Sequence, residues 1–207
     1  MSRRRVRIAV AGLLLTLAVS SGAAPALAAD PSIGRINHAG YKGRAHCTGF
    51  VARGGHVITA AHCMPDRQRS VHFLAGYDRA RYLWHLESPR SDWRQVEGLD
   101  IAILCSGAPG FPALSIADAP PEPGETVMVE GYATPRSHVL QTRRCEVVGT
   151  DSRGRMEIGC RMPPGMSGAP VLIGEGDGRS VVGVVSSTGT ATAIVHGITP
   201  RSPAACD

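Results

Sequence analysis

Short apolar runs separated by turn residues dominate the chain after its first 28 residues. The runs are rich in Val, Ile and Leu, and Gly, Pro or Asp stands between them. Helical periodicity is scarce there, and such runs favour strands. They lie at 47–52, 56–61, 71–76, 100–105, 126–132, 145–150, 156–160, 170–174, 181–187 and 192–198. About ten strands at this spacing predict an all-β sandwich or barrels.

One break in composition divides these runs into two groups. The stretch "CSGAPGFPALSIADAPPEPGE", residues 105–125, is rich in Pro, Gly and Ala, which is typical of a connection. We therefore expect an N-terminal β-domain over 29–107, a connection over 108–124 and a C-terminal β-domain over 125–207. A short helical turn is expected beside Ala60 and Ala61.

The first 28 residues have a different pattern. Arginines cluster within residues 3–7, an apolar stretch follows over 8–19, and Ala26-Leu27-Ala28 is a small-x-small site. This order predicts a secretory signal peptide over 1–28. The alternative is an uncleaved anchor, but no later run is long and apolar enough to span a bilayer. The expectation is a secreted or periplasmic protein that does not contact the membrane after cleavage.

The charge balance changes once the signal is removed. Cleavage takes away four of the 22 basic side chains and leaves 18 against 17 acidic ones, a net charge near +1. This composition lacks the basic footprint of a nucleic-acid-binding protein. The 179 remaining residues suffice for one domain or two small ones.

The cysteines indicate disulfides rather than a metal site. All six lie after the signal, and an even number in a secreted chain predicts disulfides. The sequence contains no CxxC pair, so a structural zinc site is not expected. The expected pairs are Cys47–Cys63, Cys145–Cys160 and, by elimination, Cys105–Cys206. Each of the first two would close a strand–turn–strand segment, and the turn of the second is expected at "DSRG", residues 151–154.

Three residues stand in sequence contexts that suggest catalysis. His62 is the next-to-last residue of "VITAAHC", where a disulfide at Cys63 would hold its backbone. Asp100 begins the apolar run "DIAILC", and a carboxylate that enters a core needs a partner; the alternative is a turn-capping aspartate. Ser167 lies in "GMSGAP", which is either a plain turn or an exposed nucleophile. A serine hydroxyl needs a neighbouring base before it can attack. Asp92 is the alternative to Asp100 as the acid that orients this base.

The segments "TAAHC", "DIA" and "GMSGAPV" resemble those of the chymotrypsin/trypsin-like serine peptidases, particularly their short bacterial secreted members. The resemblance covers about Ile33 to Pro200. It implies two six-stranded antiparallel β-barrels with the active site in the cleft between them. It also implies that His62 is the general base and acid, Asp100 orients it, and Ser167 is the nucleophile. The backbone N–H groups of Gly165 and Ser167 would form the oxyanion hole.

The function that this resemblance implies is a secreted serine endopeptidase acting through an acyl-enzyme. Its substrates would be proteins or peptides, and it would be a monomer that needs neither a metal nor an organic cofactor. The alternative is a binding protein that kept the fold and lost efficient catalysis. An esterase with a nucleophile elbow fits poorly, because that fold has the order Ser, Asp, His and a helix after the serine.

The residue before the serine departs from the pancreatic-type pattern. Those enzymes have an aspartate there, which pairs with the new amino terminus after zymogen cleavage, whereas this chain has Met166. No activation switch of that type is expected. Either Pro163, Pro164 and the packing of Met166 order the loop that carries Gly165 and Ser167 (the oxyanion loop), or the loop forms only when something binds.

The specificity pocket departs from the pattern as well. Arg161, beside Met162, stands six residues before Ser167, where trypsin-like enzymes have an acid. A preference for Arg or Lys is therefore not supported. Arg161 either attracts acidic side chains of the substrate or points to solvent. Ser186 and Ser187 are expected in the pocket wall, where the family pairs its backbone with the substrate chain.

Overall fold

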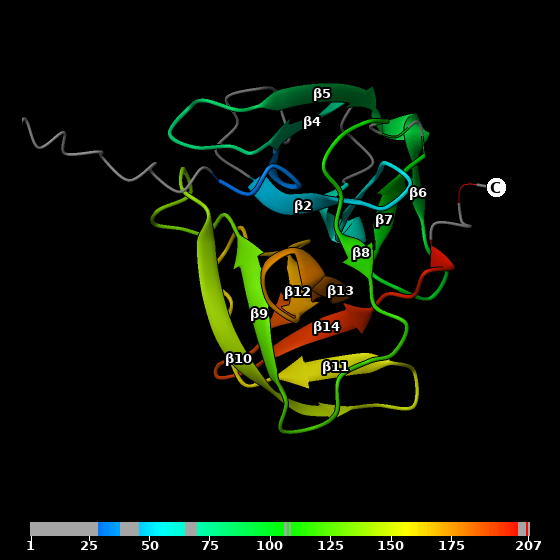
Figure 1. Ribbon diagram of the computed structural model, residues 1–207, viewed down its shortest axis with the longest axis vertical. Helices are drawn as coiled ribbons and strands as arrows, with labels where there is room; N and C mark the ends of the chain where they lie inside the picture. The colour runs from blue at the N-terminus through cyan, green and yellow to red at the C-terminus, as the bar shows by residue number, and fades with distance from the viewer. Residues whose placement is uncertain are drawn as a thin grey trace, which may run out of the picture.

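The computed structural model describes residues 29–37, 46–64, 70–105, 107, 109–202 and 206 (Figure 1). The predicted signal peptide, 1–28, lies outside the described residues. Within them, no helix is long and apolar enough to cross a membrane. The described chain is nearly all strand, with three short 3-10 helices: η1 (Ala61–Cys63), η2 (Arg90–Asp92) and η3 (Gly176–Gly178).

The N-terminal sheet is antiparallel and has seven strands in the order β5-β4-β1-β2-β3-β7-β6. No pairing between its end strands, β5 and β6, is seen in the described residues, so it forms a curled half-barrel (Figure 1). Its strands are β1 (Ile33–Asn37), β2 (His46–Ala52), β3 (His56–Thr59), β4 (Ser70–Ala75), β5 (Trp84–Pro89), β6 (Trp93–Gln95) and β7 (Ala102–Leu104).

The C-terminal sheet closes into a six-stranded barrel, because β12 pairs with both β9 and β13. A further short strand, β8, adds to β13 in parallel. The strands are β8 (Ser115–Ile116), β9 (Thr126–Gly131), β10 (Gln141–Thr150), β11 (Arg155–Ile158), β12 (Pro170–Ile173), β13 (Ser180–Thr188) and β14 (Ala193–Gly197). The predicted all-β two-barrel fold is confirmed, with a half-barrel sheet as its first half.

The N-terminal sheet is covered on both faces. Ile33 and Phe50 belong to one buried cluster, whereas Ile36 and Val51, on the opposite face of the same strands, belong to another. The first cluster also contains Leu172 and residues of β13, so it joins the two halves of the molecule. Burial on both faces explains why β1 and β2 show no polar alternation.

The β10–β11 hairpin shows how local sequence sets one element. Its turn contains the predicted "DSRG" segment, in which the Asp151 carboxylate accepts hydrogen bonds from the backbone N–H groups of Arg153 and Arg155, each at 2.9 Å. Such aspartate-centred turns replace the backbone bonds that a chain reversal loses. The Cys145–Cys160 disulfide ties the same two segments together.

The remaining disulfides connect distant parts of the fold. Cys47 on β2 is joined to Cys63 at the end of η1, and Cys105, after β7, is joined to Cys206 near the C-terminus. All six cysteines are paired. Three disulfides therefore cross-link the chain.

Candidate active site

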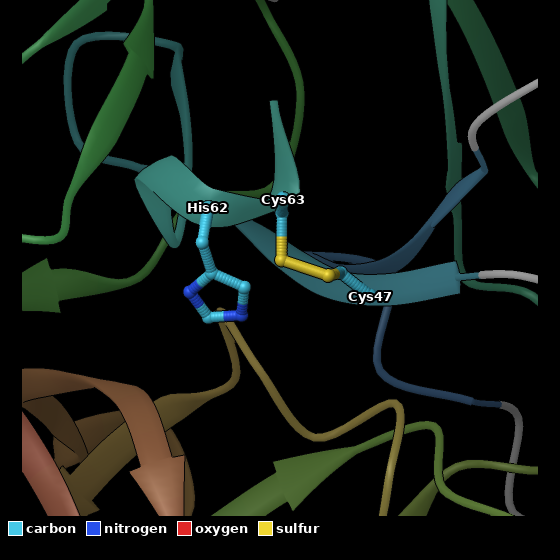
Figure 2. A group of neighbouring side chains, drawn as sticks. All are labelled: Cys47, His62 and Cys63. Carbon is cyan, nitrogen blue, oxygen red and sulfur yellow. A yellow bond between two sulfur atoms is a disulfide. The ribbon is translucent and has the colours of Figure 1, made fainter. Parts of the chain in front are cut away.

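His62 lies on η1, the short helical turn that follows β3. Burial of Ile58 and Ala60 fixes the strand end that leads into the turn. Cys63, the next residue, is also buried, and its disulfide to Cys47 ties the turn to β2 (Figure 2). The His62 side chain keeps 49% of its surface exposed. The local structure thus holds the backbone of His62 firmly and leaves its ring accessible.

Asp100 precedes β7 and contacts His62 through both carboxylate oxygens. Its Oδ2 atom lies 2.7 Å from Nδ1 of His62, and its Oδ1 atom accepts the His62 backbone N–H at 2.9 Å. An ionised carboxylate can only accept, so Nδ1 carries the proton. In the neutral ring, Nε2 then has a free lone pair, which a general base requires.

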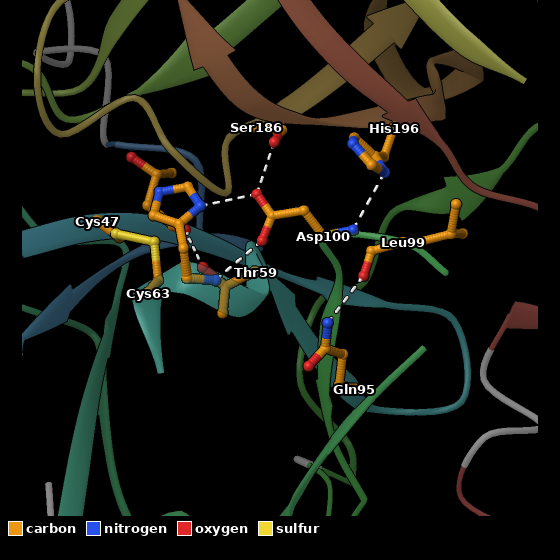
Figure 3. A network of polar contacts seen from close by, with 10 residues as sticks. Cys47, Thr59, Cys63, Gln95, Leu99, Asp100, Ser186 and His196 are labelled. Carbon is orange, nitrogen blue, oxygen red and sulfur yellow. Dashed lines mark hydrogen bonds and ion pairs between the residues drawn. A yellow bond between two sulfur atoms is a disulfide. The ribbon is translucent and has the colours of Figure 1, made fainter. Parts of the chain in front are cut away.

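A wider network surrounds Asp100 (Figure 3). Ser186 Oγ donates to Oδ2 of Asp100 at 2.6 Å, and the Asp100 backbone N–H donates to Nδ1 of His196 at 3.1 Å. Burial by itself raises the pKa of the Asp100 carboxyl, but the hydrogen bonds from His62 and Ser186 outweigh it and lower the pKa to about 2. Asp100 is therefore ionised at neutral pH.

Ser186 reaches Asp100 because of an irregularity in β13. The register with β14 shifts between Val185 and Ser187, so the strand bulges at Ser186. Bulges re-aim a side chain, and here the hydroxyl points to the carboxylate. The local sequence places Ser186 in the pocket wall by resemblance and gives no signal for this contact. Ser187, the next residue, is exposed on β13.

Ser167 follows a tight turn formed by residues 163–166. The Met166 N–H donates to the Pro163 C=O at 3.2 Å, and Gly165 has a φ of +99°. Proline before a glycine of positive φ is the signature of a type II turn. A Cβ at Gly165 would collide with the Tyr132 carbonyl, so this position excludes larger residues.

The Ser167 loop packs directly on the strands that lead to His62. The Ser167 C=O accepts the Thr48 N–H at 2.9 Å. Gly168, with a φ of +81°, lies so close that a Cβ there would collide with Thr59 Oγ1 and the Thr48 carbonyl. Thr59 is on β3, three residues before His62. The tertiary structure thus brings the Ser167 loop of the barrel against the His62 segment of the first sheet.

Two backbone donors that flank Met166 have no acceptor among the residues that the structure describes. Neither the Gly165 N–H nor the Ser167 N–H donates a hydrogen bond within the described part of the chain. The Pro164 C=O accepts the Thr134 N–H at 3.0 Å. Because the C=O and N–H of a trans peptide point in opposite directions, the Gly165 N–H faces away from Thr134. Gly165 is buried, and unpaired buried donors are rare in folded proteins.

The structure separates the two residues expected at the pocket base. Arg161 is exposed, whereas Met162 is 2% exposed and belongs to the core of the C-terminal barrel. The Met162 N–H donates to Thr188 Oγ1 on β13 at 3.0 Å. Arg161 thus lies at the surface, next to a residue whose backbone is hydrogen-bonded to β13.

One group of side chains near the site has metal-ligand spacing, but its chemistry does not suit a metal. Cys47, His62 and Cys63 have ligand atoms within 4.8 Å of one another. The two sulfur atoms are joined in a disulfide, so neither is available as a thiolate ligand. The competing acid, Asp92, lies on η2, and the carboxylate that contacts His62 is that of Asp100.

Known proteins with a similar sequence motif or fold are serine peptidases. Residues 47–184 match the family model of the trypsin-like peptidase domain. Sequence comparison with curated proteins found no match. Among solved structures, a thermostable serine protease, AL20, from an extremophilic microorganism aligns with a TM-score of 0.68 and 18% identity, over 86% of this chain and 96% of that one.

Two further solved structures have the same fold. The protease Anisep from Arthrobacter nicotinovorans aligns with a TM-score of 0.66 and 16% identity, over 87% of this chain and 98% of that one. The Rv3671c protease from M. tuberculosis, in its active form, aligns with a TM-score of 0.60 and 24% identity, over 82% and 77% of the two chains.

Proposed function

The chain belongs to the family of trypsin-like peptidase domains, and we propose that it is a secreted serine endopeptidase in which Ser167 attacks the peptide bond. The observation that carries the proposal is the contact of 2.7 Å between His62 Nδ1 and Asp100 Oδ2. That contact assigns the proton to Nδ1 and leaves Nε2 free to act as a base.

The proposed reaction proceeds through an acyl-enzyme. His62 Nε2 takes the proton of the Ser167 hydroxyl as its oxygen bonds to the carbonyl carbon of the substrate. The tetrahedral intermediate expels the amine, which receives the proton from His62, and the acyl group stays on Ser167. Water, activated by His62, then releases the acid and restores the serine. Asp100 stays ionised and stabilises the imidazolium.

The oxyanion of the tetrahedral intermediate needs donors that are already in place. The N–H groups of Gly165 and Ser167 support this role, since neither has an acceptor within the described residues and each is available to the substrate. Loss of one such donor typically lowers the rate by about 100- to 1000-fold. Paired backbone groups on either side hold this turn in place.

Secretion and domain organisation complete the proposal. The signal-like residues 1–28 would be removed, leaving β-domains over 29–107 and 125–207 joined by 108–124. The three disulfides suit an oxidising compartment. The substrates would be proteins or peptides, cleaved by a monomer.

The test is covalent labelling of the protein from Ala29 onward with a fluorophosphonate, read by intact mass. We expect one adduct on the wild type and none on Ser167→Ala or His62→Ala. Folding and disulfides are checked in each sample by circular dichroism and thiol counting. A folded, disulfide-intact wild type that forms no adduct would overturn the proposal and favour the alternative of a binding protein that kept the fold.

A further inference from the structure

Thr48 contacts the Ser167 loop through its backbone and its side chain together. It lies on β2, next to Cys47, and is fully buried. We propose that the Thr48 hydroxyl is a positioning group that holds the oxyanion loop in order, in a chain where Met166 offers no charge for that purpose. This inference rests on the proposed function, because it assigns a role within the same site.

The hydroxyl has two partners on the opposite half of the molecule. It donates to the Gly165 C=O at 2.9 Å and accepts the Tyr132 N–H at 2.9 Å. Its single proton is therefore committed to Gly165, and its orientation is set by Tyr132. Because Thr48 is 0% exposed, water does not compete for these bonds, and each is stronger than at the surface.

The backbone of Thr48 continues the same connection. Its N–H donates to the Ser167 C=O, and its C=O accepts the Thr59 hydroxyl at 2.6 Å. Thr59 belongs to the strand that leads to His62. One residue thus links the turn before Ser167, Ser167 itself and the segment that carries His62.

Two hydrogen bonds hold the Gly165 residue from both ends. Thr134 binds the Pro164 C=O, on the peptide before Gly165, while Thr48 binds the Gly165 C=O, on the peptide after it. A glycine at positive φ turns easily unless its two peptides are held. Met166 is fully buried in the barrel core, but apolar packing has no directional preference. The hydrogen bond from the Thr48 hydroxyl does have a direction, and it fixes the orientation of the peptide after Gly165.

The decisive comparison is Thr48→Val against Thr48→Ser. Valine keeps the branched shape and removes the hydroxyl, which leaves the Gly165 C=O and the Tyr132 N–H unpaired, whereas serine keeps the hydroxyl. We expect the fluorophosphonate labelling rate of Ser167 to fall about 100-fold in the valine variant and to stay within about threefold in the serine variant. The pH profile of labelling should keep its shape, because neither substitution touches the contact between His62 and Asp100.

A matched control removes a buried hydroxyl elsewhere. Ser88 on β5 is 3% exposed, and among the described residues its hydroxyl forms a hydrogen bond only with the neighbouring Pro89 carbonyl. Ser88→Ala should therefore label at the wild-type rate. A Thr48→Val protein that folds and labels like the wild type would overturn the role of Thr48 while leaving the proposed function intact.

A second measurement does not depend on activity. In the Ser167→Ala background, hydrogen exchange of the segment 162–170 should speed up at least tenfold with Thr48→Val and stay unchanged with Thr48→Ser. Unchanged exchange with valine would overturn the inference even if the wild type proved unreactive. If valine prevents folding, Thr48→Ala takes its place in both measurements. Failure of wild-type labelling alone would count against the proposed function and not against Thr48.

Discussion

Asp100 forms hydrogen bonds with four residues of the described chain, namely His62, Ser186, His196 and Ala61. Both carboxylate oxygens accept hydrogen bonds, its backbone N–H donates to His196, and its backbone C=O accepts the Ala61 N–H at 3.2 Å. Hydrogen bonds to both carboxylate oxygens and to both backbone groups therefore fix its position relative to His62. A residue held in this way can orient an imidazole without moving during the reaction.

Asp100→Asn should lower kcat by about 10⁴-fold. The amide keeps the shape but can donate to Nδ1 of His62, which moves the imidazole proton to Nε2 and removes the base. Stopped-flow labelling or peptide hydrolysis would measure the loss, and circular dichroism would check the fold. A loss of less than tenfold would mean that Asp100 does not orient His62.

The low pKa of Asp100 predicts how stability depends on pH. The folded pKa, about 2, lies below the ordinary 3.8, so the ionised carboxylate stabilises the fold above about pH 4, and this stabilisation is lost as the pH falls toward 2. In the Ser167→Ala background, urea unfolding should show a steeper loss from pH 4 to 2 than it does with Asp100→Asn added. Parallel curves would contradict the assignment.

At the scale of elements, the site depends on a turn and a bulge rather than on regular structure. The type II turn before Ser167 needs glycine at residue 165, and the tight contact of the loop with β2 and β3 needs glycine at residue 168. The bulge in β13 turns Ser186 toward Asp100. Each of these irregular features lies next to a regular strand that holds it.

Gly168→Ala should abolish labelling of Ser167 and lower the free energy of unfolding by about 2–3 kcal/mol. The new methyl group would meet the Thr48 carbonyl, and its φ of +81° disfavours alanine. Gly124→Ala is the matched control, since Gly124 also has a positive φ, +89°, but open space around it. It should cost about 1 kcal/mol by strain alone and label normally. Equal behaviour of the two variants would remove close packing as the cause.

At the scale of the whole molecule, two halves meet across a shared core. Leu172 and Val184 of the barrel pack in one cluster with Phe50 and Ile58 of the half-barrel sheet. The Cys105–Cys206 disulfide spans a sequence separation of 101 residues, against 15 for Cys145–Cys160. It therefore links the end of the first half to the end of the chain.

Replacing both cysteines of the long-range pair with serine should destabilise the protein more than the same change in the hairpin pair. The chain-entropy model gives about 4.7 kcal/mol for a loop of about 100 residues and about 3 kcal/mol for one of about 15. Urea unfolding in the Ser167→Ala background would compare the two double variants. A larger loss from Cys145 and Cys160 would show that native contacts around the hairpin disulfide outweigh loop-closure entropy.

Much of the fold followed from local pattern. Short apolar runs predicted an all-β chain, "DSRG" predicted the hairpin turn, and Ala60-Ala61 predicted the helical turn that became η1. The segments around His62, Asp100 and Ser167 pointed to their chemistry, because such motifs need only a few neighbouring residues. These features have local causes, so they are present in the sequence itself.

Four strands were not predicted, namely β1, β5, β6 and β8. The first is buried at every position, because both faces of its sheet are covered, and so it lacks alternation. The strands β5 and β6 lie at the ends of their sheet and are partly exposed, and β8 has only two residues. Their extended conformation comes from pairing with neighbouring strands. The sequence of a short segment without alternation does not predict such pairing.

The supporting residues were decided by tertiary structure alone. Thr48 meets Gly165 across 117 residues of chain, and Ser186 meets Asp100 across 86. A threonine or serine in a strand has the same local sequence whether or not such a partner exists. The sequence by itself therefore determined that the chain carries the motifs of a serine peptidase. Only the folded chain decided what holds them, because each of those hydrogen bonds forms when the two halves come together.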